Sequence, residues 1–201
     1  MNQPTLKTEY TAFLKPSAKQ PESVDVPSFS FLMIDGSGNP NTPAFEEKVS
    51  ALYSLSYALK YHLKKTQGIN FKVMEFEGLW WADDMNTFTL RDKDAWSWTI
   101  MIMQPDAVTP EVFEAIRLEV AKKKNLPALD LMRFDTYHEG LAAQIMHIGS
   151  YDAEEPTIEK LHDFITAEGK ERSGKHHEIY LTDPRKGDPN KGRTIIRQPM
   201  R

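Results

Sequence analysis

The chain has 201 residues, enough for one domain or for two small units that share a core, with 25 basic and 29 acidic side chains and a formal net charge of −4. Because it has no cysteine, disulfide scaffolds, thiolate metal sites and cysteine nucleophiles are excluded. The mildly acidic balance argues against nucleic-acid binding, and no apolar run approaches the roughly 20 residues of a membrane span, so we expect a soluble, cytoplasmic protein with neither nucleic-acid nor membrane partners.

The first half of the chain predicts a strand, a long helix and two further strands behind a polar lead-in. Residues 1–26 contain few apolar side chains, so we expect only partial order there. A strand-like run covers Ser28–Ile34 and ends at a turn rich in Gly, Ser and Asn. Thr42 and Pro43 are typical of an N-cap and a first helical residue, and Gly68 is typical of a helix end. The two strands that follow are expected at Phe71–Trp81 and Trp96–Met103.

The second half predicts two more helices and four more strands. A polar connector at 82–95 is expected to be a loop or an irregular hairpin. Thr109 and Pro110 begin the next helix by the same capping pattern. Strands are expected at Asp130–Tyr137, Leu141–Ile148, His177–Thr182 and Thr194–Arg197, and a helix at Pro156–Glu168.

The two halves of the chain also resemble each other. Phe31–Ser37 is similar to Gln144–Ser150, and each run leads into a loop with proline, a helix and two strands. Isolated strand-helix-strand-strand units would expose a sheet edge and an apolar face, so we expect the two to join edge to edge. We therefore predict an α+β fold in one domain, residues 27–201, with repeats at about 28–104 and 141–198 related by a pseudo-twofold axis around a central ligand cleft. The alternative is two similar units without duplication.

All four tryptophans lie between Trp80 and Trp98. Trp96 and Trp98 are two residues apart and share a strand face, whereas Trp80 and Trp81 point to opposite faces. Indole and phenol rings that line a cleft would stack on a flat ligand and hold a cation over their faces. Ordinary core packing is the alternative, because large aromatic side chains dominate most interiors.

A carboxylate lies among aromatic and histidine residues near the C-terminus. On a strand, Glu178 and Tyr180 share a face with His176, opposite Ile179. A carboxylate among aromatic rings is desolvated, which raises its pKa and suits a general acid or base. It would also offset the charge of a cationic ligand. A solvated strand face is the alternative, and Glu77 is the second candidate carboxylate.

Other chemistries find little support in the sequence. His176, His177 and Glu178 are adjacent on a strand and cannot converge on one metal ion. The run Gly36–Gly38 has neither the nucleophile-elbow pattern nor a phosphate-binding pattern. The run Asp183–Lys186 is predicted to be a turn. We expect no metal and no cofactor.

Several motifs together resemble the GyrI-like small-molecule-binding proteins over about Ser28 to Arg201. The motifs are EGLWW at 77–81, WTIMIMQP at 98–105, QIMHIGSY at 144–151, HEIYLTDPR at 177–185 and TIIR at 194–197. The similarity is to the stand-alone branch of the family. It implies a pair of strand-helix-strand-strand units around a central cleft.

The resemblance also implies a function. Related multidrug-responsive regulators bind aromatic, often cationic compounds against a buried glutamate whose position resembles Glu178. Some stand-alone members are hydrolases that open the strained cyclopropane of DNA-alkylating natural products. Carried over to this sequence, Glu178 would be the acid/base, with Tyr180 beside it in the catalytic set. The aromatic clamp would come from Trp80 or Trp81, Trp98 and Tyr180.

Two further aromatic residues complete the candidate ligand contacts. Trp96 shares a strand face with Trp98, and Tyr137 precedes the Glu139-Gly140 pair.

The preferred hypothesis is an enzyme that binds flat aromatic or cationic organic compounds and hydrolyses reactive ones. A sequestering or sensing module and a protein-interaction role, such as gyrase inhibition, are the alternatives. Residues 1–26 are too short and polar for the regulators' DNA-binding domain, so we expect no transcriptional role. The oligomeric state is left open.

Overall fold

The structure, a computed structural model, describes residues 6–83, 92–182 and 188–201. The chain forms two compact units. Unit 1 contains residues 1–7, 29–74 and 81–137, and unit 2 contains residues 8–28, 75–80 and 138–201. The units alternate along the sequence: residues 75–80 belong to unit 2 although they lie between two segments of unit 1.

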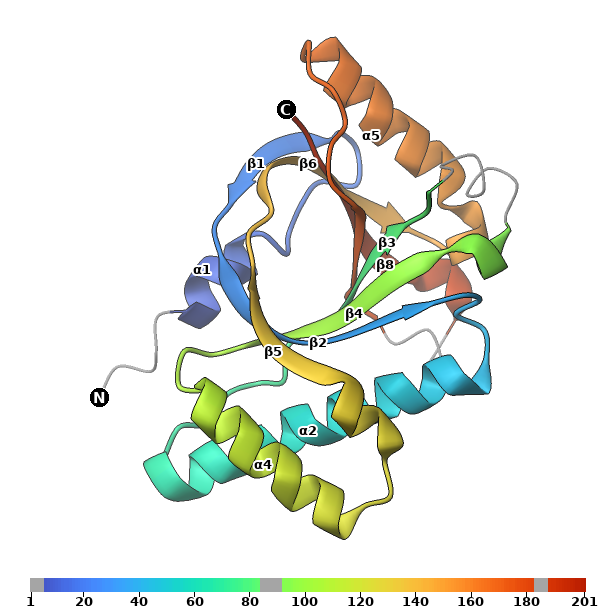
Figure 1. Ribbon diagram of the computed structural model, residues 1–201. Coiled ribbons are helices and arrows are strands. Elements are labelled where there is room, and N and C mark those ends of the chain that lie inside the picture. The colour runs from blue at the N-terminus through green and yellow to red at the C-terminus, as the bar shows by residue number, and fades with distance from the viewer. Residues whose placement is uncertain (1–5, 84–91, 183–187) are drawn as a thin grey trace. The chain divides into compact units, whose positions relative to one another are not determined.

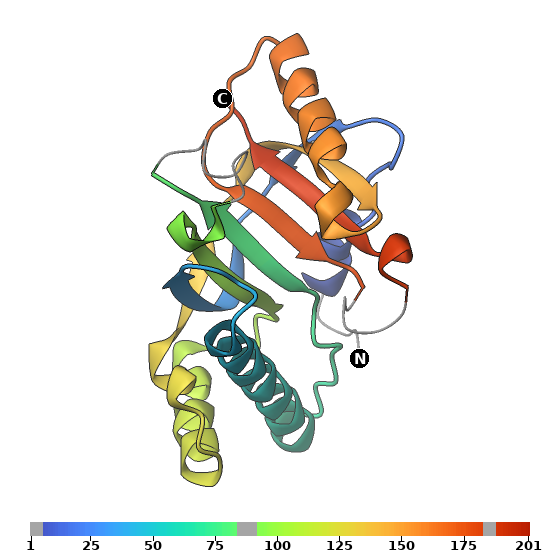
Figure 2. The same ribbon diagram turned by 90° about the vertical axis from the view of Figure 1, so that its right-hand side faces the viewer.

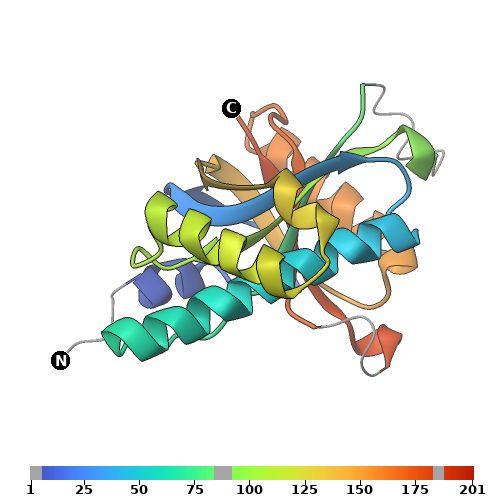
Figure 3. The same cartoon turned by 60° about the horizontal axis from the view of Figure 1, so that its bottom comes forward.

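Unit 1 has, among its described residues, a three-stranded antiparallel sheet and two long helices. Its elements are β2 (Phe29–Ser37), α2 (Pro43–Gln67), η1 (Lys93–Ala95), β4 (Ser97–Gln104), α4 (Pro110–Lys123), η2 (Pro127–Leu131) and β5 (Met132–Tyr137). The central strand is β2, which pairs with β4 on one side and β5 on the other. The two helices lie side by side, as Figures 1 and 3 show, and α2 packs on β2 and β4.

The capping residues that the sequence indicates act as predicted. The Thr42 hydroxyl accepts a hydrogen bond from the Phe45 N–H at 3.4 Å, which begins α2. Gly68 ends the same helix with a φ of 69°, a left-handed conformation that suits glycine. The Thr109 hydroxyl accepts from the Val112 N–H at 3.3 Å and begins α4. Local chemistry therefore fixes both ends of α2 and the start of α4.

Unit 2 has, over the described part of the chain, a five-stranded antiparallel sheet in the order β1-β6-β8-β7-β3. Its elements are α1 (Leu6–Ala12, from Thr8 on), β1 (Glu22–Val26), β3 (Phe76–Trp81), β6 (Gly140–Ile148), η3 (Tyr151–Ala153), α5 (Glu155–Ala167), β7 (His176–Tyr180), η4 (Pro189–Lys191) and β8 (Arg193–Pro199). Figure 2 shows β3, β7 and β8 side by side beneath α5. Within the described ranges, no helix is long and apolar enough to cross a membrane.

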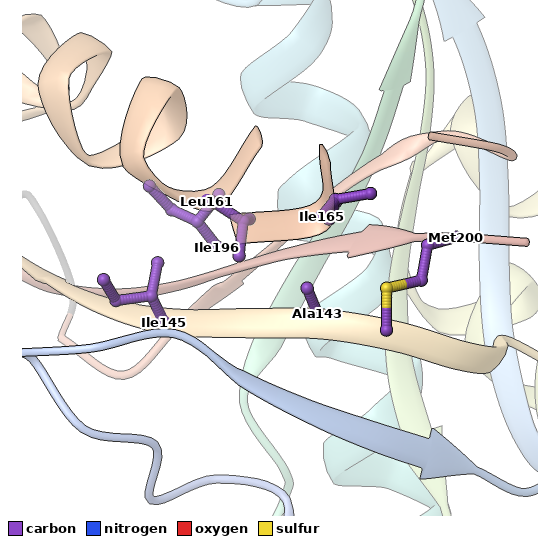
Figure 4. Close-up of a cluster of buried hydrophobic side chains, with 6 residues drawn as sticks. All are labelled: Ala143, Ile145, Leu161, Ile165, Ile196 and Met200. Atoms are coloured by element: carbon purple, nitrogen blue, oxygen red, sulfur yellow. The ribbon is translucent and has the colours of Figure 1, made fainter. Parts of the chain in front are cut away.

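The helix α5 covers one face of this sheet. Its Leu161 and Ile165 are fully buried against apolar residues of β6 and β8, as Figure 4 shows. The sheet side of this cluster consists of Ala143, Ile145, Ile196 and Met200. Because Ile196 pairs directly with Glu178, the Glu178 side chain lies on the face that α5 covers. Residues next to these along each strand, such as His177 and Arg197, lie on the opposite face.

The predicted α+β class is confirmed, and the predicted element order occurs in both halves. The first run is β2-α2-β3-β4 and the second is β6-α5-β7-β8. A duplication behind this order stays a prediction. Two strands begin at least two residues later than predicted: β3 begins at Phe76 rather than Phe71, and β5 at Met132 rather than Asp130 because a 3-10 turn occupies Pro127–Leu131.

Two elements in residues 1–26 had no sequence prediction. In β1 the apolar residues Val24 and Val26 alternate with polar ones, but two valines in five residues are too short a pattern to predict a strand. The seven-residue α1 is too short to show a helical period. Two predictions lie wholly or partly outside the described residues: the turn Asp183–Lys186, and residues 84–91 of the connector, where η1 follows at Lys93–Ala95.

Candidate functional site

A cluster of aromatic and ionisable side chains surrounds Glu178 on the α5 face of unit 2. We call it the Glu178 cluster, and its members are Phe76, Trp80, Tyr151, Glu154, His176, Glu178, Tyr180 and Thr194. The side chains of His176 and Glu178 are 11% and 15% exposed. They are therefore largely desolvated but within reach of a ligand.

Two neighbours on β7 hold the Glu178 carboxylate. His176 Nε2 lies 3.0 Å from Glu178 Oε1, and the Tyr180 hydroxyl donates to Oε2 at 2.5 Å. The sequence predicted a raised pKa for Glu178, and this prediction was wrong. Burial does raise the pKa, but the hydrogen bonds and the charge of His176 outweigh burial and hold the pKa of Glu178 below its usual value. The group is an ionised carboxylate at neutral pH.

Tyr180 connects this carboxylate to further aromatic rings. Burial and the charge of Glu178 raise the pKa of Tyr180 well above its usual value, so the hydroxyl stays a donor. Its ring centroid lies 5.4 Å from that of Phe76, and 5.6 Å from that of Tyr151 in an edge-on arrangement. Aromatic rings therefore stand beside the carboxylate, as the sequence predicted for Tyr180.

Trp80 lies on the same face as Glu178. On β3, Gly78 pairs with Glu178, and Trp80 pairs with His176. The indole of Trp80 folds over Gly78, because a Cβ atom added at Gly78 would lie 2.7 Å from the indole Nε1. Trp80 is thus placed opposite Glu178, while its neighbour Trp81 points to the other face of β3. Three predicted residues, Trp80, Glu178 and Tyr180, are brought together.

We predict that Gly78→Ala weakens binding of aromatic cations by about tenfold, the effect of losing one aromatic contact. The added methyl group would displace the Trp80 indole from its position opposite Glu178. Fluorescence titration with a planar cationic dye measures the affinity. In a Trp80→Ala background the same glycine substitution should have no further effect. An additional loss in that background would show that Gly78 acts through something other than Trp80.

The other predicted aromatic contacts belong to unit 1. Trp98 is 2% exposed, packs edge-on against Phe45 at 4.8 Å and donates its indole N–H to the Gly38 carbonyl at 3.1 Å. Lys93 Nζ lies 5.8 Å from the Trp96 ring centroid, and Tyr137 meets a phenylalanine ring, Phe31, edge-on at 6.4 Å. These contacts give Trp98 a packing role. A role in ligand binding stays a prediction for Trp81, Trp96, Trp98 and Tyr137.

A second polar cluster crosses the opposite face of the unit 2 sheet. Glu22, Gln144, Arg197 and His177 stand directly opposite one another on β1, β6, β8 and β7. The row ends on β3 at Glu77, which accepts a hydrogen bond from His177 Nε2 at 2.9 Å and another from the Tyr10 hydroxyl. One chain of hydrogen bonds therefore ties all five strands and α1 together. Glu22 is exposed. We call the buried members of this set, Tyr10, Glu77, Gln144, His177 and Arg197, together with Glu139, the buried row.

Charges balance within the buried row. Arg197 donates to Glu139 Oε2 at 2.7 Å and to the Gln144 side-chain oxygen at 2.8 and 3.0 Å. His177 Nδ1 lies 2.8 Å from Glu139 Oε1. With a carboxylate at each ring nitrogen, His177 is held as the imidazolium ion. Two cations thus face the carboxylates of Glu77 and Glu139, which offsets much of the cost of burial.

The pKa values of two groups follow from these pairs. Burial lowers the pKa of His177, but the charges and hydrogen bonds of Glu139 and Glu77 outweigh it and raise the pKa to about 9. Burial raises the pKa of Glu139, but His177 and Arg197 outweigh it and lower the pKa to about 2. Both groups are therefore charged at neutral pH.

We predict that the free energy of unfolding falls at alkaline pH. Because the pKa of His177 is raised in the folded state, its contribution is complete below about pH 6.5 and is lost as the pH rises through about 9. The loss should be about 3 kcal/mol. Urea unfolding at both pH values and an NMR titration of the His177 ring measure it. A ring that titrates near its usual pKa, with stability unchanged, would contradict the prediction.

The structure separates the two candidate carboxylates that the sequence singled out. Glu77 is fully buried within the buried row, on the face opposite Glu178. Sequence reasoning missed Tyr10, Glu139, Glu154 and Arg197 as members of the two clusters. Arg197 could have been suspected as a charged residue that directly follows two isoleucines in a predicted strand. Over the described parts of the chain, no group of three or more His, Asp or Glu side chains is placed to hold a metal ion.

The sequence matches the GyrI-like small molecule binding domain over residues 19–201. No curated protein matches the chain. An uncharacterized conserved protein from Listeria innocua is 36% identical, with 98% of each chain covered and a TM-score of 0.89. A hydrolase from Listeria innocua is also 36% identical, with 100% of both chains covered and a TM-score of 0.86.

A more distant likeness shows the fold alone. The C-terminal domain of EcmrR is 11% identical, with 90% of this chain and 97% of that domain covered and a TM-score of 0.58. The family match extends over nearly the whole chain, and the two Listeria innocua proteins match it from end to end. This chain belongs to the GyrI-like small-molecule-binding family.

Proposed function

We propose that the Glu178 cluster binds hydrophobic, flat aromatic compounds, often cationic, and hydrolyses reactive ones such as cyclopropane-bearing DNA alkylators. The observation that carries the proposal is the placement of the Glu178 carboxylate, which His176 and Tyr180 hold by hydrogen bonds and which lies on the same sheet face as Trp80. In this proposal Glu178 takes a proton from the attacking water.

The cluster suits a flat cation by its chemistry. The rings of Phe76, Trp80, Tyr151 and Tyr180 offer aromatic surface, and a cation near such rings is attracted by their faces. The largely buried carboxylate of Glu178 would offset the ligand's charge. We also propose Trp81, Trp96, Trp98 and Tyr137, which belong to unit 1, as candidates for ligand contacts.

The same carboxylate suits hydrolysis. A general base must be ionised at the working pH and must lie within hydrogen-bond reach of water. His176 and Tyr180 lower the pKa of Glu178, so the carboxylate is ionised. Its side chain is 15% exposed, so a water molecule can reach it. The similarity to a Listeria innocua hydrolase over the full chain supports this class of reaction.

Incubation with a cyclopropane-bearing alkylator tests the proposal. We expect the product to be the compound plus one water, with isotope-labelled water placing its oxygen on the opened carbon. Tryptophan fluorescence should be quenched on binding, because Trp80 lies in the cluster. Quenching without conversion would favour a sequestering or sensing module. Absence of both quenching and conversion would contradict the proposal.

A further inference from the structure

Glu154 stands directly before α5 and is only 5% exposed. Its N–H donates to the Tyr151 carbonyl at 3.2 Å. Its own carbonyl accepts from the Thr157 and Ile158 N–H groups at 2.8 and 3.0 Å. The turn that begins α5 therefore fixes the position of this residue beside the Glu178 cluster.

The side chain of Glu154 turns away from its own helix. It makes no capping hydrogen bond to α5 and is instead hydrogen-bonded to the Thr194 side chain on β8. Thr194 pairs directly with Tyr180, whose hydroxyl is bonded to Glu178. The two carboxyl groups are thus neighbours within one cluster.

One carboxyl oxygen of Glu154, Oε1, makes no hydrogen bond to the described residues. This oxygen is also buried. A buried polar atom without a partner costs about 1–3 kcal/mol, and such atoms are few in native proteins. Stability does not explain an acidic side chain with a free oxygen at this place, whereas contact with a ligand does.

We propose that Glu154 is a second catalytic carboxyl group, which gives a proton to the substrate oxygen while Glu178 takes a proton from water. This assignment rests on the function proposed above and deepens it. It gives the cluster a general acid as well as a general base. It requires a substrate in which the electron pair of the broken bond moves to an oxygen atom, which Glu154 then protonates.

The charges of the cluster support this division of roles. Burial and the negative charge of Glu178 raise the pKa of Glu154 to about 9, although the Thr194 hydrogen bond opposes the shift. The pKa of Glu178 is lowered by its own partners. The other titratable groups on this face are His176 and Tyr180 on β7, Tyr151 on η3, and His147 on β6, which pairs with Thr194. Neighbouring carboxyl groups whose pKa values are pushed apart are a common acid–base pair.

The reaction balances with these two groups and one water. For a cyclopropane conjugated to a carbonyl, the water oxygen bonds to a ring carbon and the carbon–carbon bond breaks. The electron pair of that bond moves through the conjugated system to the carbonyl oxygen. Glu178 receives the water proton, and Glu154 protonates the carbonyl oxygen. Transfer of a proton from Glu178 to Glu154 then restores the starting state.

The test compares Glu154→Gln with wild type, using a cyclopropane conjugated to a carbonyl as the probe. Gln is the neutral isostere of the protonated acid but cannot release a proton, so we expect unchanged probe affinity and a turnover about 100-fold lower. Glu159→Gln, an exposed change on α5, is the matched control and should behave as wild type. The infrared difference spectrum between wild type and Glu154→Gln should show a carboxylic acid at pH 7 that ionises as the pH rises through about 9.

The outcomes distinguish this proposal from the one on which it rests. Wild-type conversion with equal turnover by Glu154→Gln would overturn the role of Glu154 and leave the hydrolase proposal standing. No conversion by wild type would overturn both. An infrared spectrum showing an ionised Glu154 at pH 7 would overturn the role of Glu154 even if turnover falls, and it can be read without any substrate.

Discussion

Glu178→Gln is expected to lower the turnover of a cyclopropane-bearing alkylator by about 10²- to 10⁴-fold, the range that one general base contributes. The amide has nearly the shape of the carboxylate but cannot accept a proton from water. It also removes the charge that His176 and Tyr180 stabilise. Affinity for cationic ligands should fall as well, whereas affinity for neutral aromatic compounds should change little.

Steady-state kinetics and dye titrations on the same preparations measure both effects. Glu168→Gln, an exposed change just after α5, controls for the loss of one negative charge. Equal turnover by Glu178→Gln and wild type would remove Glu178 from catalysis. A fall in turnover that Glu168→Gln shares would point to net charge as the cause.

Arg197→Met should lower the free energy of unfolding by about 3–5 kcal/mol, as expected when one partner of a buried ion pair is removed. Arg197 is 1% exposed and is the link between Glu139 and Gln144 in the buried row. Its loss leaves the fully buried Glu139 carboxylate with His177 as its remaining cation. Met has a similar length and apolar stem, so the effect comes from the missing charge and hydrogen bonds.

A surface ion pair provides the matched control for Arg197→Met. Arg133 lies 2.5 Å from Asp35, but the two side chains are 40% and 60% exposed. Solvent screens such a pair, so Arg133→Met should cost less than about 1 kcal/mol. Urea unfolding of both variants gives the comparison. Equal costs would show that the buried row does not stabilise unit 2 beyond an ordinary surface pair.

Local signals in the sequence were sufficient for most of the fold. The N-caps Thr42 and Thr109 and the glycine at position 68 act through neighbours within a few residues, so their roles could be predicted without the tertiary structure. By contrast, β1 is a polar strand whose place depends on pairing with β6, more than a hundred residues away. Neither its pattern nor its length reveals that partner.

In the candidate site, too, the features set by local sequence could be predicted and those set by tertiary contacts could not. The shared face of His176, Glu178 and Tyr180 follows from strand alternation and was found from the sequence. The lowered pKa of Glu178 depends on which groups donate to it, which only the side-chain geometry shows. Glu154 reaches the cluster across the start of a helix, a placement that no spacing in the sequence indicates.

The buried row shows why cross-strand partners escape sequence reasoning. Glu77 and His177 are hydrogen-bonded although 100 positions separate them along the chain. Their contact depends on the register of β3 against β7, and a shift of one residue would move every side chain to the other face. Along the sequence His177 stands beside Glu178, whereas its partners in the fold are Glu77 and Glu139.

A crystal structure of Glu178→Gln with a cyclopropane-bearing alkylator is the most direct test of the ligand site. The variant should bind the compound without converting it, so the intact ligand can be seen. We expect its ring system against Trp80 and Tyr180, with the cyclopropane facing residue 178 and the carbonyl oxygen within hydrogen-bond reach of Glu154. A ligand bound away from the α5 face of unit 2, with the Glu178 cluster unchanged, would contradict this assignment.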